Sequence, residues 1–396
     1  MHFHLKVYTL KRVKKPIIKK SKIDAVLESL GSRYFNHISK NIEYKDEIKI
    51  QNIPSDKILN VVSSNISTYT VIIAFLVGAL TTVPSVLFDI YYRDEFQVLS
   101  YYLILGGITL ALLIVEISTL YWLGMRSSYT LTELIGYSNP NQDNLPPEYD
   151  IKKIMVRSAL ELDDLNIEYL GIKLDKHISK KWVLISSLLY KAKIVLSSAI
   201  TRAILSKLFT REGLRVSFVW VSVPITAFWD AIVMYRVIRD ARIRLFGYHL
   251  SKYITDEVLS DKVLDRYSPH TVEGTIRAVS TIIVLAKNYH PNNIILLMRL
   301  TNHFKIEEAK DYDNLEIFLE HLKNSSEEER HLLRTLAGIS AVFDGKLNRK
   351  ERKALQEIFG DKYKKYMSFT KELQSLLLDS KLHQSAQLCS DYLKAS

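Results

Sequence analysis

Long apolar stretches alternate with polar segments over the first two thirds of the chain. The first stretch, residues 69–88, reads YTVIIAFLVGALTTVPSVLF and contains no charge. At about 1.5 Å of rise per residue, twenty helical residues cover a hydrocarbon core of roughly 30 Å. The second stretch, residues 98–123, contains one charge, Glu116. A short hydrophilic turn near residues 93–95 joins the two, so the pattern predicts an antiparallel membrane hairpin.

Two later stretches predict a second hairpin. Residues 182–205 are apolar but interrupted by basic residues that include Lys191 and Arg202. Such a helix either spans the membrane with its polar stripe turned toward other helices, or lies in the interface plane. Residues 216–238 are apolar except for Asp230 and Arg236 and predict a further span. About four transmembrane helices are therefore expected.

From Tyr248 onward the pattern is helical throughout. Leu332, Leu336, Ile339 and Phe343 recur at helical spacing and predict one buried face. Two capping boxes are expected to begin helices, and Gly360 is placed to end the second of them. The boxes are formed by Ser326 with Glu329 and by Asn348 with Glu351. The fold class predicted for the whole chain is an all-α polytopic membrane protein with a soluble C-terminal helical bundle.

These patterns divide the chain into five parts. The predicted parts are a basic cytosolic region (1–65), a first transmembrane hairpin (66–124), a cytosolic linker with an amphipathic helix over 151–165 (125–181), a second transmembrane hairpin (182–247) and a cytosolic helical domain (248–396).

Charge distribution predicts the orientation. The net charge is +11, and residues 1–65 hold 13 Lys and Arg against 6 Asp and Glu, whereas residues 248–396 hold 22 against 21. With four spans the main basic flanks all fall on one side, which predicts a bacterial cytoplasmic membrane protein with both termini cytosolic. Lys207, Arg211 and Arg215 fall on the other side, so the interfacial alternative for residues 182–205 stays open.

Ionisable residues inside the predicted spans form the first candidate site. Glu116, Lys191 and Asp230 are each expected about 12–13 Å from the cytosolic end of their helix, by the helical rise. Arg202 shares the polar stripe of Lys191, and Ser222, Thr226 and Asp230 form a second stripe. A charge at this depth is costly unless it is paired or hydrated. Two interpretations follow: an ion or proton pathway, or salt bridges that hold the spans together.

The segment FDGKLNRKE, residues 343–351, forms the second candidate site. Alignment with a calcium-binding EF-hand loop places Val342 at a position that requires an oxygen ligand, which argues against calcium. The helix–DGxL–NxxE–helix arrangement over residues 327–360 resembles TerB-like domains, and the chain also resembles bacterial multi-pass proteins that join membrane hairpins to such a domain. The resemblance implies Asp344 and Glu351 as weak candidate ligands of a divalent metal and implies no activity.

The third candidate is the basic N-terminal run. The first 22 residues contain eight basic residues and no acidic one. These residues either contact anionic lipid headgroups or form a flexible tail that only directs the positive end of the chain to the cytosolic side, while the lack of interleaved aromatic residues argues against nucleic acid. The proposed lipid-surface patch consists of Lys11, Arg12, Lys14, Lys15, Lys19, Lys20 and Lys22.

The sequence contains no phosphate-binding, dinucleotide-binding, zinc-protease or nucleophile-elbow motif, and the single cysteine, Cys389, excludes an internal disulfide. No cofactor and no enzymatic activity are predicted. The leading interpretation is a membrane-anchored interaction or stress-sensing module whose C-terminal domain binds a protein partner, with homo-oligomerisation as an option. The alternative is an ion or proton channel or transporter subunit that uses the intramembrane charges, and a membrane enzyme of unknown chemistry ranks third.

Overall fold

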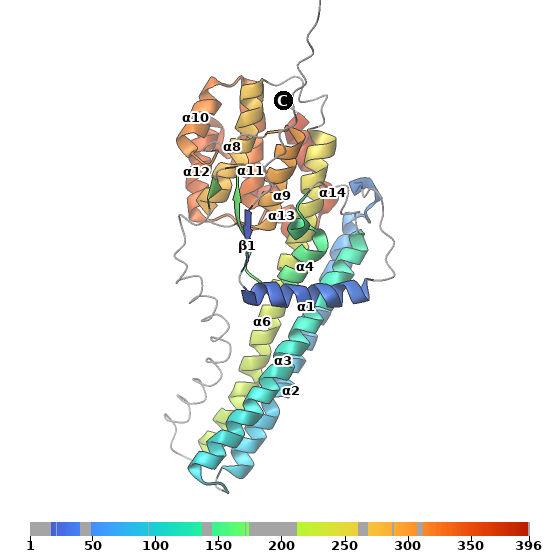
Figure 1. Cartoon of the computed structure of the whole chain (residues 1–396), viewed down its shortest axis with the longest axis vertical. Helices are drawn as coiled ribbons and strands as arrows, with labels where there is room; N and C mark the ends of the chain where they lie inside the picture. Colours follow the sequence, from blue (N-terminus) through green and yellow to red (C-terminus); the bar gives the residue numbers. More distant parts are fainter. Residues whose placement is uncertain are drawn as a thin grey trace, which may run out of the picture.

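The computed structural model describes residues 17–20, 22–39, 49–93, 95–136, 145–170, 172–173, 212–259, 268–286, 289–306 and 312–394. These residues confirm the all-α class, apart from one small sheet. Three helices run side by side below a compact group of shorter helices (Figure 1). They are α2 (Asp56–Tyr92), α3 (Val98–Ile135) and α6 (Glu212–Tyr253).

The three long helices are each long and apolar enough to cross a membrane. Pro84 lies inside α2 and Pro224 inside α6, and neither ends its helix, as is common where neighbouring helices support the backbone. The apolar stretch predicted as a span over residues 182–205 lies outside the described residues, so the count of four stays a prediction. The helices extend past the apolar stretches, and the predicted domain boundary at residue 248 falls inside α6.

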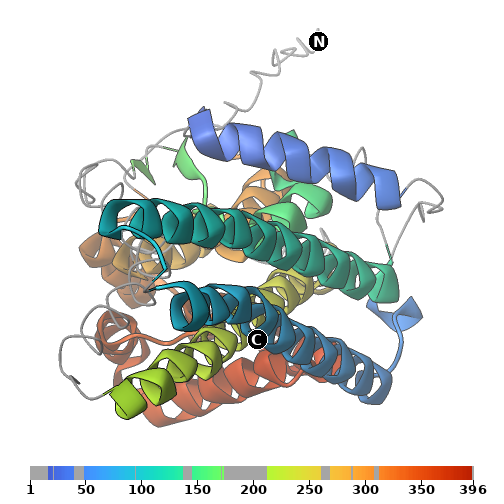
Figure 2. The same cartoon turned by 90° about the horizontal axis from the view of Figure 1, so that it is seen from below.

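Small side chains allow these helices to approach closely. The inward face of α2 is formed by Ser63, Thr70, Ala74, Gly78 and Thr82, which are all buried. Thr70 also hydrogen-bonds to α3, with 2.7 Å between its Oγ1 and the Ser127 Oγ. Seen from below, α2 lies between the near ends of α3 and α6, and farther along α6 contacts both helices (Figure 2). Small residues and interhelical hydroxyl contacts are typical of helix packing in lipid. No hydrophobic force drives helices together there, so close packing and hydrogen bonds hold them.

The outward faces of the same helices are apolar. The most exposed of their large side chains lie on α2 and α3, where they form a surface that would be unfavourable in water. They include Tyr69, Leu80, Val98, Leu99 and Leu103. Together with the length of the helices, this exposed apolar surface indicates association with a membrane.

The C-terminal helices pack around a buried core. Leu332, Leu336, Ile339 and Phe343 are fully buried, as their spacing predicted. Both predicted capping boxes are present, and Gly360 ends α12 with a φ of +53°. The helices are α8 (Pro269–Ala286), α9 (Pro291–His303), α10 (Leu315–Asn324), α11 (Glu327–Val342), α12 (Arg349–Phe359), α13 (Tyr363–Leu378) and α14 (Leu382–Lys394), with a π-helical turn, η4, at Ile254–Val258 and a 3-10 turn, η5, at Gly360–Lys362.

A layer of short elements lies where the long helices meet this bundle. Helix α1 (Lys22–Ile38) lies across the long helices (Figure 1), and α4 (Ile151–Ala159) packs against it. The sequence pattern missed a small antiparallel sheet of order β1-β2-β3, in which Ile18 pairs with Ile167. Its strands are β1 (Ile17–Lys19), β2 (Asn166–Tyr169) and β3 (Ile172–Lys173), and two 3-10 turns, η1 (Ile50–Asn52) and η2 (Pro147–Tyr149), precede α2 and α4.

Helix α4 is shorter than the sequence predicted. It begins after Asp150, whose carboxylate accepts a hydrogen bond from the Lys152 amide, and it ends at Ala159 rather than near Leu165. The chain needs the intervening residues to leave the helix and enter β2, which hydrophobic spacing alone does not reveal.

Candidate functional site

Two carboxylates meet between the three apolar helices. Asp230 on α6 is 1% exposed, and Glu116 on α3 is 7% exposed. Asp230 lies against Gly78 of α2, so closely that a Cβ built on Gly78 would come within 2.5 Å of the Asp230 Oδ2. Glu116 accepts a hydrogen bond from Thr81 Oγ1 at 2.6 Å. Gly78 and Thr81 are one helical turn apart on α2, so both carboxylates face the same narrow part of the helix bundle.

This pair has unusual electrostatics. The two carboxylates are close enough to interact electrostatically, and within the described residues the Asp230 Oδ2 has no hydrogen-bond partner. An ionised carboxylate in apolar surroundings is strongly disfavoured, and two that are adjacent disfavour each other further. The pair therefore suits a proton or a small cation.

The structure describes part of the site expected from sequence. Glu116 and Asp230 come together, and Ser222 and Asp230 are buried on the inward stripe of α6 with Thr226 half-buried between them. Lys191 and Arg202 lie outside the described residues, so their part of the candidate site stays a prediction.

The turn between α11 and α12 uses its acidic residues to hold the backbone. Asp344 Oδ1 accepts a hydrogen bond from the Lys346 amide at 2.8 Å, and Glu351 Oε2 accepts one from the Asn348 amide at 2.6 Å. Glu351 is buried, and burial together with the nearby Asp344 carboxylate raises the pKa of Glu351 to about 7. Within the described residues no group of three or more His, Cys, Asp and Glu side chains is suited to a metal.

The N-terminal basic run is described only at its end. Lys11, Arg12, Lys14 and Lys15 lie outside the described residues, and the side chain of Lys19 is not described. Lys22 is exposed, whereas Lys20 pairs with Glu28 at 2.8 Å. Glu28 also pairs with Arg157 of α4 at 2.6 Å. Although burial opposes its ionisation, these two cations hold the pKa of Glu28 below its usual value.

Sequence reasoning missed a second charged cluster, at the base of the helical bundle. Asp240 and Arg244, one turn apart on α6, form an ion pair of 2.5 Å, and Arg244 also pairs with Asp164 at 2.8 Å. Ser158 of α4 donates a hydrogen bond to Asp240 at 2.7 Å. The i, i+4 spacing of Asp240 and Arg244 was readable from the sequence, but their approach to α4 depends on long-range packing.

Comparisons with protein-family models, with curated proteins and with solved structures find no match to this chain. The resemblance of residues 327–360 to TerB-like domains accordingly stays a prediction from sequence.

Proposed function

We propose that the chain is a membrane-anchored sensing or regulatory module, in which the arrangement of the membrane helices is transmitted to the C-terminal helical domain. The observation that supports this proposal best is the continuity of α6. This helix extends without a break from the far end of the long-helix bundle into the core of the domain (Figure 1). A tilt or shift of α6 in the membrane would therefore move a core element of the domain.

A second connection links α2 to the turn between α13 and α14. Asp56, at the start of α2, accepts hydrogen bonds from the His383 and Gln384 amides at 2.8 and 2.9 Å. Its carboxylate thus caps the first turn of α14, as a local N-cap residue would. Farther along α2, the Asn60 side chain donates to the Asp379 carbonyl at 2.8 Å.

Further contacts surround the same turn. Ser63 of α2 donates to Ser380 at 3.0 Å, and Arg242 of α6 donates to the Leu378 carbonyl at 2.8 Å. Ser380 has a positive φ of 61°, a conformation that a non-glycine residue adopts only when its surroundings enforce it. Two membrane helices thus hold one turn of the domain, which supports a mechanical coupling.

The connectivity supports four crossings. Lys173 belongs to the sheet beside the helical domain, whereas α6 begins at the opposite end, near the turn between α2 and α3 (Figure 1). If α2, α3 and α6 span the bilayer, the chain must cross it once more between Lys173 and Glu212. With the basic flanks inside, we propose a bacterial cytoplasmic membrane protein with both termini and the helical domain in the cytosol.

Helix α1 supports an additional contact with lipid. It crosses the long helices near Met125, where the apolar stretch of α3 ends, and exposes Val26 and Leu30, with Lys22 exposed at its start. An amphipathic helix with apolar and basic side chains at this level is suited to the headgroup region of an anionic leaflet. The C-terminal helical domain, on the cytosolic side, would bind a protein partner.

Hydrogen exchange of the full chain in lipid nanodiscs tests the coupling. In a Gly78→Ala variant the new methyl group would displace Asp230 and separate α2 from α6. We expect faster exchange of the amides at the start of α14, which Asp56 caps. Gly106→Ala is the matched control, because its Cβ would meet no atom within 4 Å. A folded Gly78→Ala variant with native exchange in α14 would contradict the proposal.

A second function, proton or cation conduction, is favoured by the pair of Asp230 and Glu116. Flux into liposomes that contain the purified chain tests it. If the pair forms the pathway, Asp230→Asn and Glu116→Gln each abolish a flux that Glu357→Gln, an exposed substitution of the same kind on α12, leaves unchanged. Absence of flux from the native chain under proton, sodium and potassium gradients would rule this function out.

A further inference from the structure

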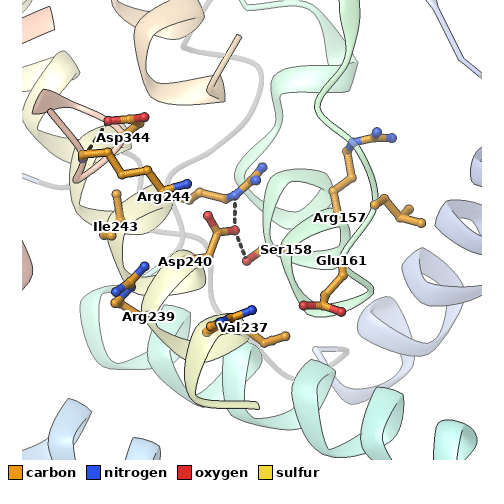
Figure 3. A pocket seen from close by; sticks show the side chains of 12 residues that line it. Arg157, Ser158, Glu161, Val237, Arg239, Asp240, Ile243, Arg244 and Asp344 are labelled. Atoms are coloured by element: carbon orange, nitrogen blue, oxygen red, sulfur yellow. Dashed lines mark hydrogen bonds and ion pairs between the residues drawn. The ribbon is translucent and has the colours of Figure 1, made fainter. Parts of the chain in front are cut away.

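A cavity opens where the long helices meet the helical domain. It has a volume of about 230 Å³ and lies between the end of α4, the middle of α6 and the turn between α11 and α12. Figure 3 shows Asp240 between Arg244 and Ser158, with Arg239 on one side and Arg157 and Glu161 on the other. Basic side chains outnumber acidic ones in its lining. The basic residues are Arg157, Arg236, Arg239, Arg244 and Lys346.

Two of these five cations are occupied by internal ion pairs. Arg244 pairs with Asp240 and Asp164, and Arg157 pairs with Glu28. Both arginine side chains are more than nine-tenths buried. They fix the wall of the cavity, and within the described residues the Arg157 Nε still lacks a hydrogen-bond partner.

The other three cations are available to a ligand. Among the described residues, the side chains of Arg236, Arg239 and Lys346 form no hydrogen bond or ion pair. Arg236 is exposed and Arg239 half-buried, and the two come from neighbouring turns of α6, while Lys346 approaches from the turn after α11. The acidic lining residues Asp344 and Glu161 already have partners of their own. The cavity thus presents positive side chains from two separate elements that are not held in close ion pairs, beside the carboxylates of Asp344 and Glu161.

Size and position narrow the choice of anion. The cavity is smaller than the roughly 300–1,000 Å³ typical of sites for drug-sized ligands, so it suits a small polar group. Arg236 lies at the end of the apolar stretch 216–238 and Arg239 follows that stretch, which places both near the level of lipid headgroups. Arginine binds phosphate oxygens through paired N–H groups, and lysine adds a point charge.

We propose that this cavity binds a phosphate ester, held by Arg236, Arg239 and Lys346. The phosphate belongs either to an anionic lipid headgroup that enters from the bilayer or to a small soluble phosphorylated molecule. In both cases the bound phosphate connects α6 to the α11–α12 turn. This site is independent of the pair of Asp230 and Glu116 and of the α2 contacts with the α13–α14 turn.

Thermal unfolding and native mass spectrometry of the full chain in detergent test the proposal. Inorganic phosphate and glycerol phosphate are compared with sodium chloride at equal ionic strength, and retention of phosphatidylglycerol is compared with that of phosphatidylcholine. We expect stabilisation by phosphate or selective retention of phosphatidylglycerol. An Arg236→Gln/Arg239→Gln variant should weaken the affinity at least about tenfold, because it removes two charge-assisted contacts.

The controls separate this site from general charge effects. Arg352→Gln/Lys353→Gln removes the same charge from an exposed face of α12 and should leave binding unchanged. Lys346→Gln should weaken binding without altering either α6 arginine. Stabilisation by glycerol phosphate alone identifies a soluble ligand, and selective lipid retention alone identifies a headgroup. Equal effects of phosphate and chloride without lipid selectivity, or equal losses in both double variants, would overturn the proposal.

Discussion

Glu329 and Glu351 occupy the same position in two capping boxes, yet their carboxyls are shifted in opposite directions. Burial, with Asp344 nearby, raises the pKa of Glu351 to about 7. Burial also opposes the ionisation of Glu329, but hydrogen bonds from Thr271, Ser268 and Ser326 outweigh it and lower its pKa to about 2. The same motif therefore holds an acid that resists ionisation in one helix and a stable carboxylate in the other.

Opposite pH effects follow for the two glutamine variants. The stability that protonated Glu351 contributes to the folded state is fully present below its unfolded pKa near 4.5 and is lost as the pH rises through 7. Glu351→Gln should therefore raise the free energy of unfolding at pH 8 by about 1–3 kcal/mol and have little effect at pH 4.5. Its amide oxygen can still accept the hydrogen bond of the capping box.

Glu329→Gln should show the opposite pH dependence to Glu351→Gln. The stability that the ionised Glu329 contributes is present above its unfolded pKa near 4.5 and is lost as the pH falls toward 2. This variant should lose about 1 kcal/mol at pH 8, and the loss should shrink at low pH. Unfolding of the full chain in detergent at several pH values measures the stability of both glutamine variants. Variants that lose stability to the same extent at pH 8 would contradict the assignment.

At the level of elements, local signals predicted helix starts and ends better than helix lengths. The capping boxes at Ser326 and Asn348 and the stop at Gly360 depend on neighbouring residues, and all three are confirmed. The continuation of α6 to Tyr253 and the short sheet depend on distant partners, which one sequence does not show. The contact of Asp230 with Gly78 also requires the packing of α2 on α6, although the cost of a buried acid already marked Asp230 as a candidate.

A tight contact between α6 and α9 gives the next prediction. Asn292 donates hydrogen bonds to the carbonyls of Ile243 and Phe343 at 2.9 and 2.8 Å. A Cβ on Gly247 would lie 2.0 Å from the Asn292 Nδ2, so Gly247→Ala must displace this side chain. Loss of both bonds leaves the buried Asn292 amide group without its two acceptors, and we expect the free energy of unfolding to fall by about 1–4 kcal/mol.

Gly107→Ala provides the comparison for Gly247→Ala. It lies within α3, and its Cβ would meet no atom within 4 Å. Alanine is favoured over glycine inside a helix by up to about 1 kcal/mol, so this variant should be neutral or stabilising. Thermal unfolding of both variants in the same detergent distinguishes a steric effect at Asn292 from a general effect of the substitution. Equal stability of the two variants would refute the role of Asn292.

For the whole molecule, the two sets of charges occupy different levels of one framework. Asp230 and Glu116 lie within the apolar helices, whereas Arg236, Arg239 and Lys346 surround the cavity where the helices enter the domain. α6 connects both levels because it carries Asp230 and the two arginines. A change of charge at Asp230 and occupation of the cavity would thus act on the same helix.

The topology of the chain can be tested with single cysteines, because the native Cys389 is fully buried and burial raises the pKa of its thiol, which suppresses its reaction. Three exposed positions are suited to the substitution: Glu95 in the turn between α2 and α3, Lys364 on α13 and Ser29 on α1. We expect a membrane-impermeant maleimide added to intact bacterial cells to label Glu95→Cys but neither Lys364→Cys nor Ser29→Cys. Permeabilised cells should then label all three.

This pattern would place the turn between α2 and α3 outside and the domain and α1 inside. Since α6 begins near that outer turn and Lys173 lies beside the domain, the chain would then need a crossing between residues 173 and 212. Labelling of Glu95→Cys and Lys364→Cys from the same side would show that the long helices do not span the bilayer. The apolar faces of α2 and α3 would then have to be covered by protein, and the proposed coupling would lose its membrane component.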